Sequence, residues 1–233
     1  ALFLLERNLM ANCDNSVLEV FMVGGTSSLR GSLSAKLIKG AVDAPLSWKL
    51  RNVARWGFIK GWLFWHLAWL FSRVTEIPTV VSSLSIRVRR ANGEWVDYGT
   101  VCYRVVTDAG VAFLVDDMDN STTDITTFNY HGVGTGTTAE SASQTALVTE
   151  CTTVLNPDST RATGTKSQPS ANVLRSVGTV TFDGSAAVTE HGFFSQAATG
   201  GGTMFDRSVY AAVNVAAADS IQFTYDLTFT SGG

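Results

Sequence analysis

The strongest pattern in the chain is an alternation of apolar and polar residues close to its last residue. Every second residue of segment 220–230 is apolar: Ile221, Phe223, Tyr225, Leu227 and Phe229. A period of two is typical of a β-strand with one buried and one exposed face, because successive side chains of a strand point to opposite sides. The segment therefore predicts a strand that covers a core with one face.

Further short strands are expected along the same half of the chain, separated by turns that are rich in Gly, Pro, Asn and Asp. We expect them over residues 111–115, 128–130, 147–152, 173–182, 186–194 and 203–215. Short strands at this spacing are typical of two packed antiparallel sheets. The chain is therefore expected to be mainly β, with an antiparallel β-sandwich or jelly roll after residue 107.

The first half of the chain contains a helical pattern. Asp43 and Pro45 predict a helix start, and a helical period continues over residues 46–74. Gly57 and Gly61 interrupt this pattern, so it fits either two helices or one kinked helix. The pattern is basic at first and rich in Trp later.

Strands flank this helical segment on both sides. Residues 17–23 and 80–89 have the composition of strands, and Asn92-Gly93 is a strong hairpin signal before a returning strand that begins near Trp95. The first half is therefore predicted to be an α+β module that contains a Trp-rich helix.

Charge divides the chain into the same two parts. Residues 1–107 contain 13 Lys and Arg against 7 Asp and Glu, a net charge of +6, and all six Trp residues. Residues 108–233 contain 4 Lys and Arg against 13 Asp and Glu, a net charge of −9. This shift predicts two modules: a basic, Trp-rich α+β anchor or interface module over 1–107, and an acidic, Thr- and Gly-rich β-sandwich over 108–233.

The apolar run 61–71 has three readings: a membrane span, an interfacial helix, or a helix buried against protein. It contains about 11 residues, whereas a membrane-spanning helix needs about 20. We therefore favour burial against protein. The apolar start, residues 1–5, is cut short by Glu6 and Arg7 and does not fit a secretory signal. Three widely spaced residues, Cys13, Cys102 and Cys151, predict reduced thiols and a reducing compartment.

Nothing in the sequence has the spacing of a known catalytic, cofactor or metal site. The Gly-rich segment 132–138 lacks the Lys of a phosphate-binding loop and is expected to be a turn or loop, and the acidic loop 116–124 does not match a calcium-binding pattern. None of the three His residues, His66, His131 and His191, is spaced for metal binding. We therefore expect no catalytic residues, no cofactor and no metal.

Two adjacent pairs, Glu190-His191 and Asp206-Arg207, could suggest acid–base chemistry. Adjacent residues of a strand point to opposite faces, which argues against a shared role within either pair. The sequence therefore predicts a protein that is not an enzyme.

Six segments after residue 116 have the sequence of a known protein family: 129–140, 145–150, 156–164, 178–182, 188–194 and 202–209. Through these segments the chain resembles a family of uncharacterised virion structural proteins of tailed bacteriophages, and residues 1–107 resemble the same proteins more loosely. These segments contain no active-site motif. The resemblance implies a virion component that is assembled in the host cytoplasm.

A capsid decoration or cement protein that stabilises the head is the favoured role within the virion. Its expected partners are copies of itself, as a homotrimer, and the major capsid protein or other virion proteins, with no small-molecule substrate. Nucleic acid and membrane are disfavoured as partners. Aromatic side chains are common anchors of protein interfaces, and the expected interface residues are Arg51, Arg55, Trp56, Trp62, Trp65, Trp69 and Phe71.

Two other roles remain open. The first is a neck, tail or fibre-base structural component. The second is a receptor- or glycan-binding module, for which the candidate aromatic sites are Tyr130-His131 and Phe193-Phe194. A membrane-active role would require segment 43–75 to bind lipid.

Overall fold

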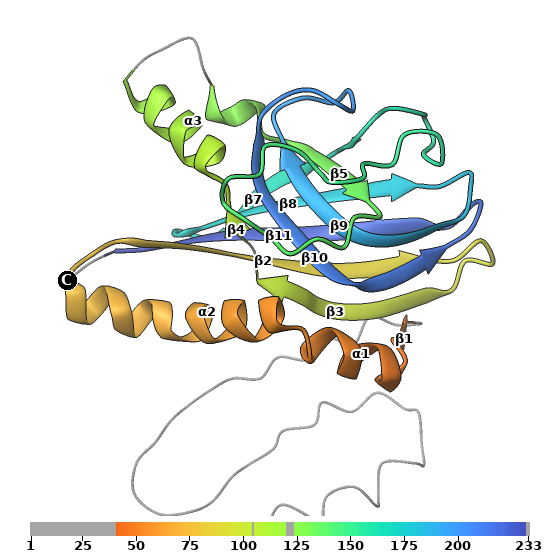
Figure 1. Ribbon diagram of the computed structural model, residues 1–233, viewed down its shortest axis with the longest axis horizontal. Helices are drawn as coiled ribbons and strands as arrows, with labels where there is room; N and C mark the ends of the chain where they lie inside the picture. The colour runs from red at the N-terminus through yellow and green to blue at the C-terminus, as the bar shows by residue number, and fades with distance from the viewer. Residues whose placement is uncertain (1–40, 104, 120–123, 232–233) are drawn as a thin grey trace, which may run out of the picture. The chain divides into compact units, whose positions relative to one another are not determined.

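The computed structural model describes residues 41–103, 105–119 and 124–231. Within these ranges the chain is mainly β and contains two sheets, which confirms the predicted class (Figure 1). The strand expected over 17–23 lies outside the described residues.

The larger sheet has six strands in the order β1–β3–β2–β11–β8–β7. Only β1 and β3 are parallel; the other neighbours are antiparallel. Its strands are β1 (Ala41–Asp43), β2 (Thr79–Arg89), β3 (Trp95–Tyr103), β7 (Thr165–Ser170), β8 (Val173–Thr181) and β11 (Ser220–Thr230). The alternating segment is β11, near the middle of this sheet. Burial alternates along most of it, as predicted, although Phe229 near its end is 42% exposed.

The smaller sheet has five strands in the order β4–β10–β9–β5–β6, with every neighbouring pair antiparallel. Its strands are β4 (Val105–Val106), β5 (Tyr130–Gly134), β6 (Ala162–Thr163), β9 (Ala186–Phe194) and β10 (Met204–Val215). Buried residues of both sheets belong to one hydrophobic cluster, which includes Leu84, Ile86, Phe193, Val213, Ile221, Phe223 and Tyr225.

Two helices lie against the larger sheet at β3, and the first of them also contacts β10 of the smaller sheet (Figure 1). They are α1 (Leu46–Val53) and α2 (Trp56–Thr75), so the helical segment is divided into two helices. Gly61 allows α2 to lie close to β3, because a Cβ atom at this position would be 2.7 Å from the Cβ of Tyr103. A larger residue there would push α2 away from the sheet.

The predicted strand over 111–115 is wrong, because these residues lie in helix α3 (Asp108–Met118). The Thr107 hydroxyl caps the helix by accepting a hydrogen bond from the Gly110 backbone N–H at 3.0 Å. Gly110 also allows a close approach to β10, because a Cβ atom there would be 2.5 Å from the Phe205 carbonyl oxygen. A local cap thus outweighs the apolar run that favoured a strand.

Two other expectations differ from the structure. The strand expected over 147–152 is a loop that makes a single bridge, between Glu150 and Gly134. The Gly-rich segment 132–138, expected to be a turn or loop, is a loop only after Gly134, because its first three residues lie in β5. Glycine leaves room there for large neighbours. A Cβ atom at Gly134 would be 2.5 Å from the Glu190 carboxylate, and one at Gly132 would be 2.8 Å from the Phe194 ring.

The division of charge near residue 107 does not coincide with a division of the sheets. Strand β2, from the basic part, pairs along its whole length with β11, from the acidic part. The described residues between 41 and 231 belong to one compact unit. The described strands on both sides of residue 107 therefore share one sheet.

Candidate functional site

The most exposed apolar surface among the described residues lies on α1 and α2. Only Ala68 and Ser72 of α2 are buried. Several large side chains of the two helices are half exposed or more, which is unusual for a helix that packs on a sheet. They are Leu46, Leu50, Trp56, Leu63, Phe64, Trp69, Leu70 and Val74.

Helix α2 is apolar around most of its circumference, and two opposite faces of it have different surroundings. The face toward the sheet carries Gly61 and Trp65, and the Trp65 ring lies 5.7 Å from the Tyr103 ring. The opposite face carries six residues at alternating spacings of four and three, which we call the outer seam of α2. They are Trp56, Lys60, Leu63, Leu67, Leu70 and Val74.

All the predicted interface residues lie on or beside these two helices. Trp56, Trp69 and Phe71 are 71%, 61% and 49% exposed. Trp62 and Trp65 are 44% and 37% exposed and lie toward the flank and the sheet side of the helix. Their role as interface residues stays a prediction.

The two arginines predicted as charge partners have different surroundings. Arg51 is exposed on α1. Arg55 is partly buried at the junction of the helices, where it donates a hydrogen bond to the Val209 carbonyl oxygen and pairs with Glu140 at 3.6 Å. Arg55 therefore fixes the helices to β10 and to the loop that contains Glu140.

Sequence reasoning missed the aliphatic members of the outer seam of α2. It selected tryptophans for their size, but Leu63, Leu67 and Leu70 occupy the face opposite the sheet. The alternating spacing of four and three places these residues on one side of the helix, but the sequence does not show whether that side is covered.

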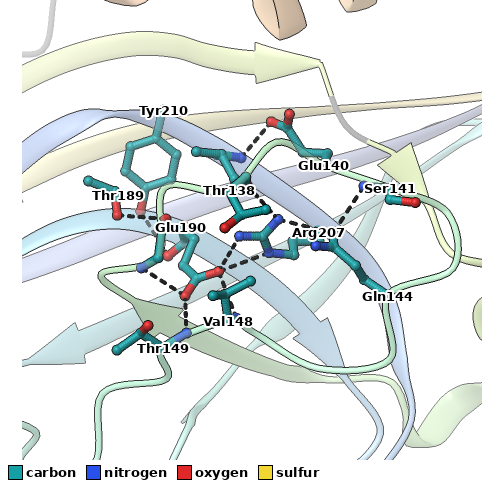
Figure 2. Close-up of polar contacts among 12 residues, drawn as sticks. Thr138, Glu140, Ser141, Gln144, Val148, Thr149, Thr189, Glu190, Arg207 and Tyr210 are labelled. Carbon is teal, nitrogen blue, oxygen red and sulfur yellow. Dashed lines mark hydrogen bonds and ion pairs between the residues drawn. The ribbon is translucent and has the colours of Figure 1, made fainter.

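A buried ion pair joins β9 to β10 (Figure 2). The guanidinium of Arg207 donates two hydrogen bonds to the Glu190 carboxylate, at 2.6 and 2.8 Å, and neither side chain is exposed. The same carboxylate accepts hydrogen bonds from the backbone N–H groups of Gly136, Val148 and Thr149. The pair thus holds loop 136–149 against the smaller sheet.

The remaining hydrogen bonds of Arg207 are also to this loop. Its guanidinium donates to the Thr138 carbonyl oxygen and to the Gln144 side chain, each at 3.0 Å (Figure 2). Glu190 and Arg207 therefore contact each other and several groups of the loop, which fits a role in fixing the loop.

The fold brings together two histidines that the sequence separates by 60 residues. His131 Nδ1 lies 3.0 Å from His191 Nε2, and His131 Nε2 lies 2.9 Å from the Ser176 hydroxyl. All three side chains are fully buried. Strands β5 and β9 are neighbours in the smaller sheet and bring the two histidines together, which their separation along the sequence does not indicate.

The histidine pair lacks the third ligand of a typical protein metal site. Among the described residues, no group of three His, Cys, Asp or Glu side chains is arranged to hold a metal ion. A hydrogen bond between two ring nitrogens needs one N–H and one lone pair, so the two nitrogens that face each other cannot both carry a proton.

The aromatic residues predicted for a receptor or glycan site do not form an exposed surface. His131, Phe193 and Phe194 are at most 2% exposed, and Tyr130 is partly buried. This prediction is wrong for these residues, because β5 and β9 lie inside the smaller sheet and are covered on both faces.

An open groove of about 980 Å³ lies elsewhere, between the last turns of α2 and strands β7, β8 and β11. Exposed Trp69 and Phe229 line it, together with Arg73, Lys166 and Asn172. Aromatic, basic and amide side chains therefore meet in one exposed hollow.

The two cysteines that the structure describes, Cys102 and Cys151, are buried, and neither forms a disulfide. Burial raises the pKa of the Cys151 thiol to about 11, and the nearby Glu190 and Glu150 carboxylates add to the shift. The thiol is therefore protonated at neutral pH and is a poor nucleophile.

No helix in the described part of the chain is long and apolar enough to cross a membrane. The chain matches no protein-family model, no curated protein and no solved structure.

Proposed function

We propose that this chain is a structural protein of a bacteriophage virion that decorates or cements the head. Its two sheets would form an antiparallel β-sandwich of the jelly-roll type that builds the body of the subunit. The surface of α1 and α2 would contact neighbouring subunits and the major capsid protein. The particle would assemble in the host cytoplasm.

The exposed apolar surface of α1 and α2 is the observation that carries this proposal. Monomeric soluble proteins rarely expose a large continuous apolar patch, and such patches commonly mark protein interfaces. Trp56, Trp69 and Val74 are 61–75% exposed, so most of their apolar surface is in water in the isolated chain. Burial of this apolar surface against a partner would stabilise the complex by about 25 cal/mol for each Å² removed from water.

The copy number of the protein in purified virions tests the proposal. Quantitative mass spectrometry of particles from the phage that encodes the chain would give its ratio to the major capsid protein. A ratio of one, or a simple fraction of one, supports a decoration role. A few copies for each particle would indicate the neck, tail or fibre base, and absence from the particle would overturn the proposal.

The groove between α2 and β7 favours a second candidate function, which is glycan binding. Aromatic faces and amide groups are suited to sugars, because they combine apolar contact with hydrogen bonds, and Trp69, Phe229 and Asn172 provide both. Binding of the full chain to host-cell glycans, lost in Phe229→Ala, would support this function over head decoration.

A further inference from the structure

Helix α3 carries a second exposed apolar stripe, at a distance from α1 and α2 (Figure 1). Val111, Val115 and Met118 are 50%, 59% and 84% exposed. Asp108 is also exposed and continues the stripe by one turn toward the start of the helix. The opposite side of α3 is occupied, because Gly110 lies against the backbone of β10.

The stripe on α3 matches part of the outer seam of α2 in both spacing and charge. The α3 residues follow one another at intervals of three, four and three, and so do four α2 residues. In each helix the first position is charged and the next three are apolar. The two sets are Asp108, Val111, Val115 and Met118 in α3, and Lys60, Leu63, Leu67 and Leu70 in α2.

We propose that α3 of one copy of this chain packs along α2 of a second copy, parallel and in register. Intervals of three and four place side chains along the seam between two helices, where apolar residues interlock. In this arrangement Leu63 meets Val111, Leu67 meets Val115, and Leu70 meets Met118. The inference deepens the proposed function, because it names one partner for the α2 surface.

Charge sets the direction of the pairing. When the helices are parallel, Lys60 lies beside Asp108 at one end of the contact. An antiparallel arrangement would place Lys60 beside Met118 and Asp108 beside Leu70, and would bury both charges without partners. A single polar layer in an apolar seam is a known way to fix the register of two helices.

The other end of the contact has matching charges as well. Arg73 lies three residues after Leu70 in α2, and Asp119 directly follows Met118 in α3. Both are exposed. The parallel arrangement brings these two charges to the same end, whereas the antiparallel arrangement separates them.

The contact joins two different surfaces of the same chain, so it is heterologous. Helices α2 and α3 lie on different sides of the two sheets, which prevents the pairing within one copy (Figure 1). A heterologous contact either closes into a ring or continues as a chain of subunits. A closed ring of three would give the homotrimer expected from the sequence.

A mixing experiment with the purified full chain tests this pairing. Leu67→Glu damages only the α2 side and Val115→Glu damages only the α3 side, so each variant should sediment as a monomer of 24.9 kDa. In an equimolar mixture, α3 of the Leu67→Glu variant and α2 of the Val115→Glu variant are both intact and can pair. The mixture should therefore form a heterodimer and nothing larger. Val148→Glu, at an exposed position outside both helices, is the matched control and should assemble like the wild type.

Charge exchange gives a second measurement of the same contact. Lys60→Asp and Asp108→Lys should each weaken assembly in sedimentation, and the double variant should restore it. Because Asp108 also lies in the first turn of α3, thermal unfolding of each variant separates lost contact from lost folding.

Three results would overturn the inference. The wild-type chain could sediment as a monomer at every concentration. Val115→Glu could assemble normally while Leu67→Glu does not, which would indicate contact between two α2 helices. Leu67→Glu could lower the melting temperature of a monomer, which would indicate that Leu67 packs against another part of its own chain. None of these results depends on whether the protein is found in virions.

Discussion

Several glycines of this protein lie where a side chain would clash with a buried neighbour. The His131 ring lies between two glycines, and a Cβ atom at Gly178 would be 2.3 Å from its Cδ2. At Gly164 a Cβ atom would be 2.2 Å from the Ser176 hydroxyl that contacts the same ring. The buried histidine pair therefore depends on the absence of side chains at these positions.

We expect Gly178→Ala to lower the free energy of unfolding by about 1–3 kcal/mol, because overpacking a core forces its neighbours to move. Chemical denaturation measures this change. Gly57→Ala is the matched control, since its Cβ atom would meet only the end of the Glu140 side chain, at 2.9 Å, and alanine favours a helix. Equal stability of wild type and Gly178→Ala would contradict the packing described for His131.

Asp219 shows how one carboxylate can join two turns. It accepts hydrogen bonds from the Ala216 and Ala91 backbone N–H groups and from the Arg90 guanidinium. Burial by itself would raise its pKa, but these hydrogen bonds and the Arg90 charge outweigh burial, so the pKa of Asp219 is lowered. The ionised form is therefore favoured in the folded state.

Because the pKa of Asp219 is lower in the folded state, its ionised form stabilises the fold. This stabilisation is complete above the pKa of Asp in the unfolded chain, near 3.9, and is lost as pH falls through the pKa of Asp219 in the folded state. We expect Asp219→Asn to be less stable than the wild type at pH 7 by about 1–3 kcal/mol. The difference should shrink below about pH 4. Urea unfolding between pH 2.5 and 7 measures both curves. Asp183→Asn at an exposed turn is the control, and parallel curves for wild type and Asp219→Asn would contradict the assignment.

At the scale of elements, the smaller sheet is held to its covering loop by the buried pair of Glu190 and Arg207. Removal of one partner leaves a buried charge, which costs about 3–5 kcal/mol. Arg207→Met should therefore lower the free energy of unfolding by about that amount. Arg175→Met removes a similar but partly exposed pair with Asp226 and should cost about 0–1 kcal/mol. Similar losses for the two variants would contradict the role given to burial.

At the scale of the whole molecule, the protein combines a well-packed two-sheet body with helices that are apolar on two sides. The packed core between the sheets stabilises the fold. The outer seam of α2 is exposed and does not contribute to that core. We therefore expect changes on that side to affect association far more than folding.

The double variant Trp56→Ala, Trp69→Ala tests this separation. Both rings are largely exposed, so the free energy of unfolding should change by less than about 1 kcal/mol. Binding to phage particles that lack the protein should fall strongly, because aromatic residues dominate interface energies. Cosedimentation with such particles measures it, and Phe229→Ala is the control for the groove that Trp69 also lines. Normal binding by the double variant would place the anchor elsewhere.

Local sequence determined those elements whose pattern needs no partner to be recognised. The period of two gave β11, Asn92-Gly93 gave the turn between β2 and β3, and Pro45 with the helical period gave α1 and α2. Each of these patterns depends on the backbone geometry of a single segment, so residues close together in the sequence are enough to predict it.

Tertiary structure alone decided which distant residues meet. The pairing of His131 with His191, the loop held by Glu190 and Arg207, and the burial of Phe193 all depend on which strands are neighbours in a sheet. The sequence also could not tell which side of α2 faces β3, because this helix is apolar around most of its circumference. Burial depends on the whole fold. The exposed face of α2 can therefore be identified only from the structure, in which the other face packs against the larger sheet.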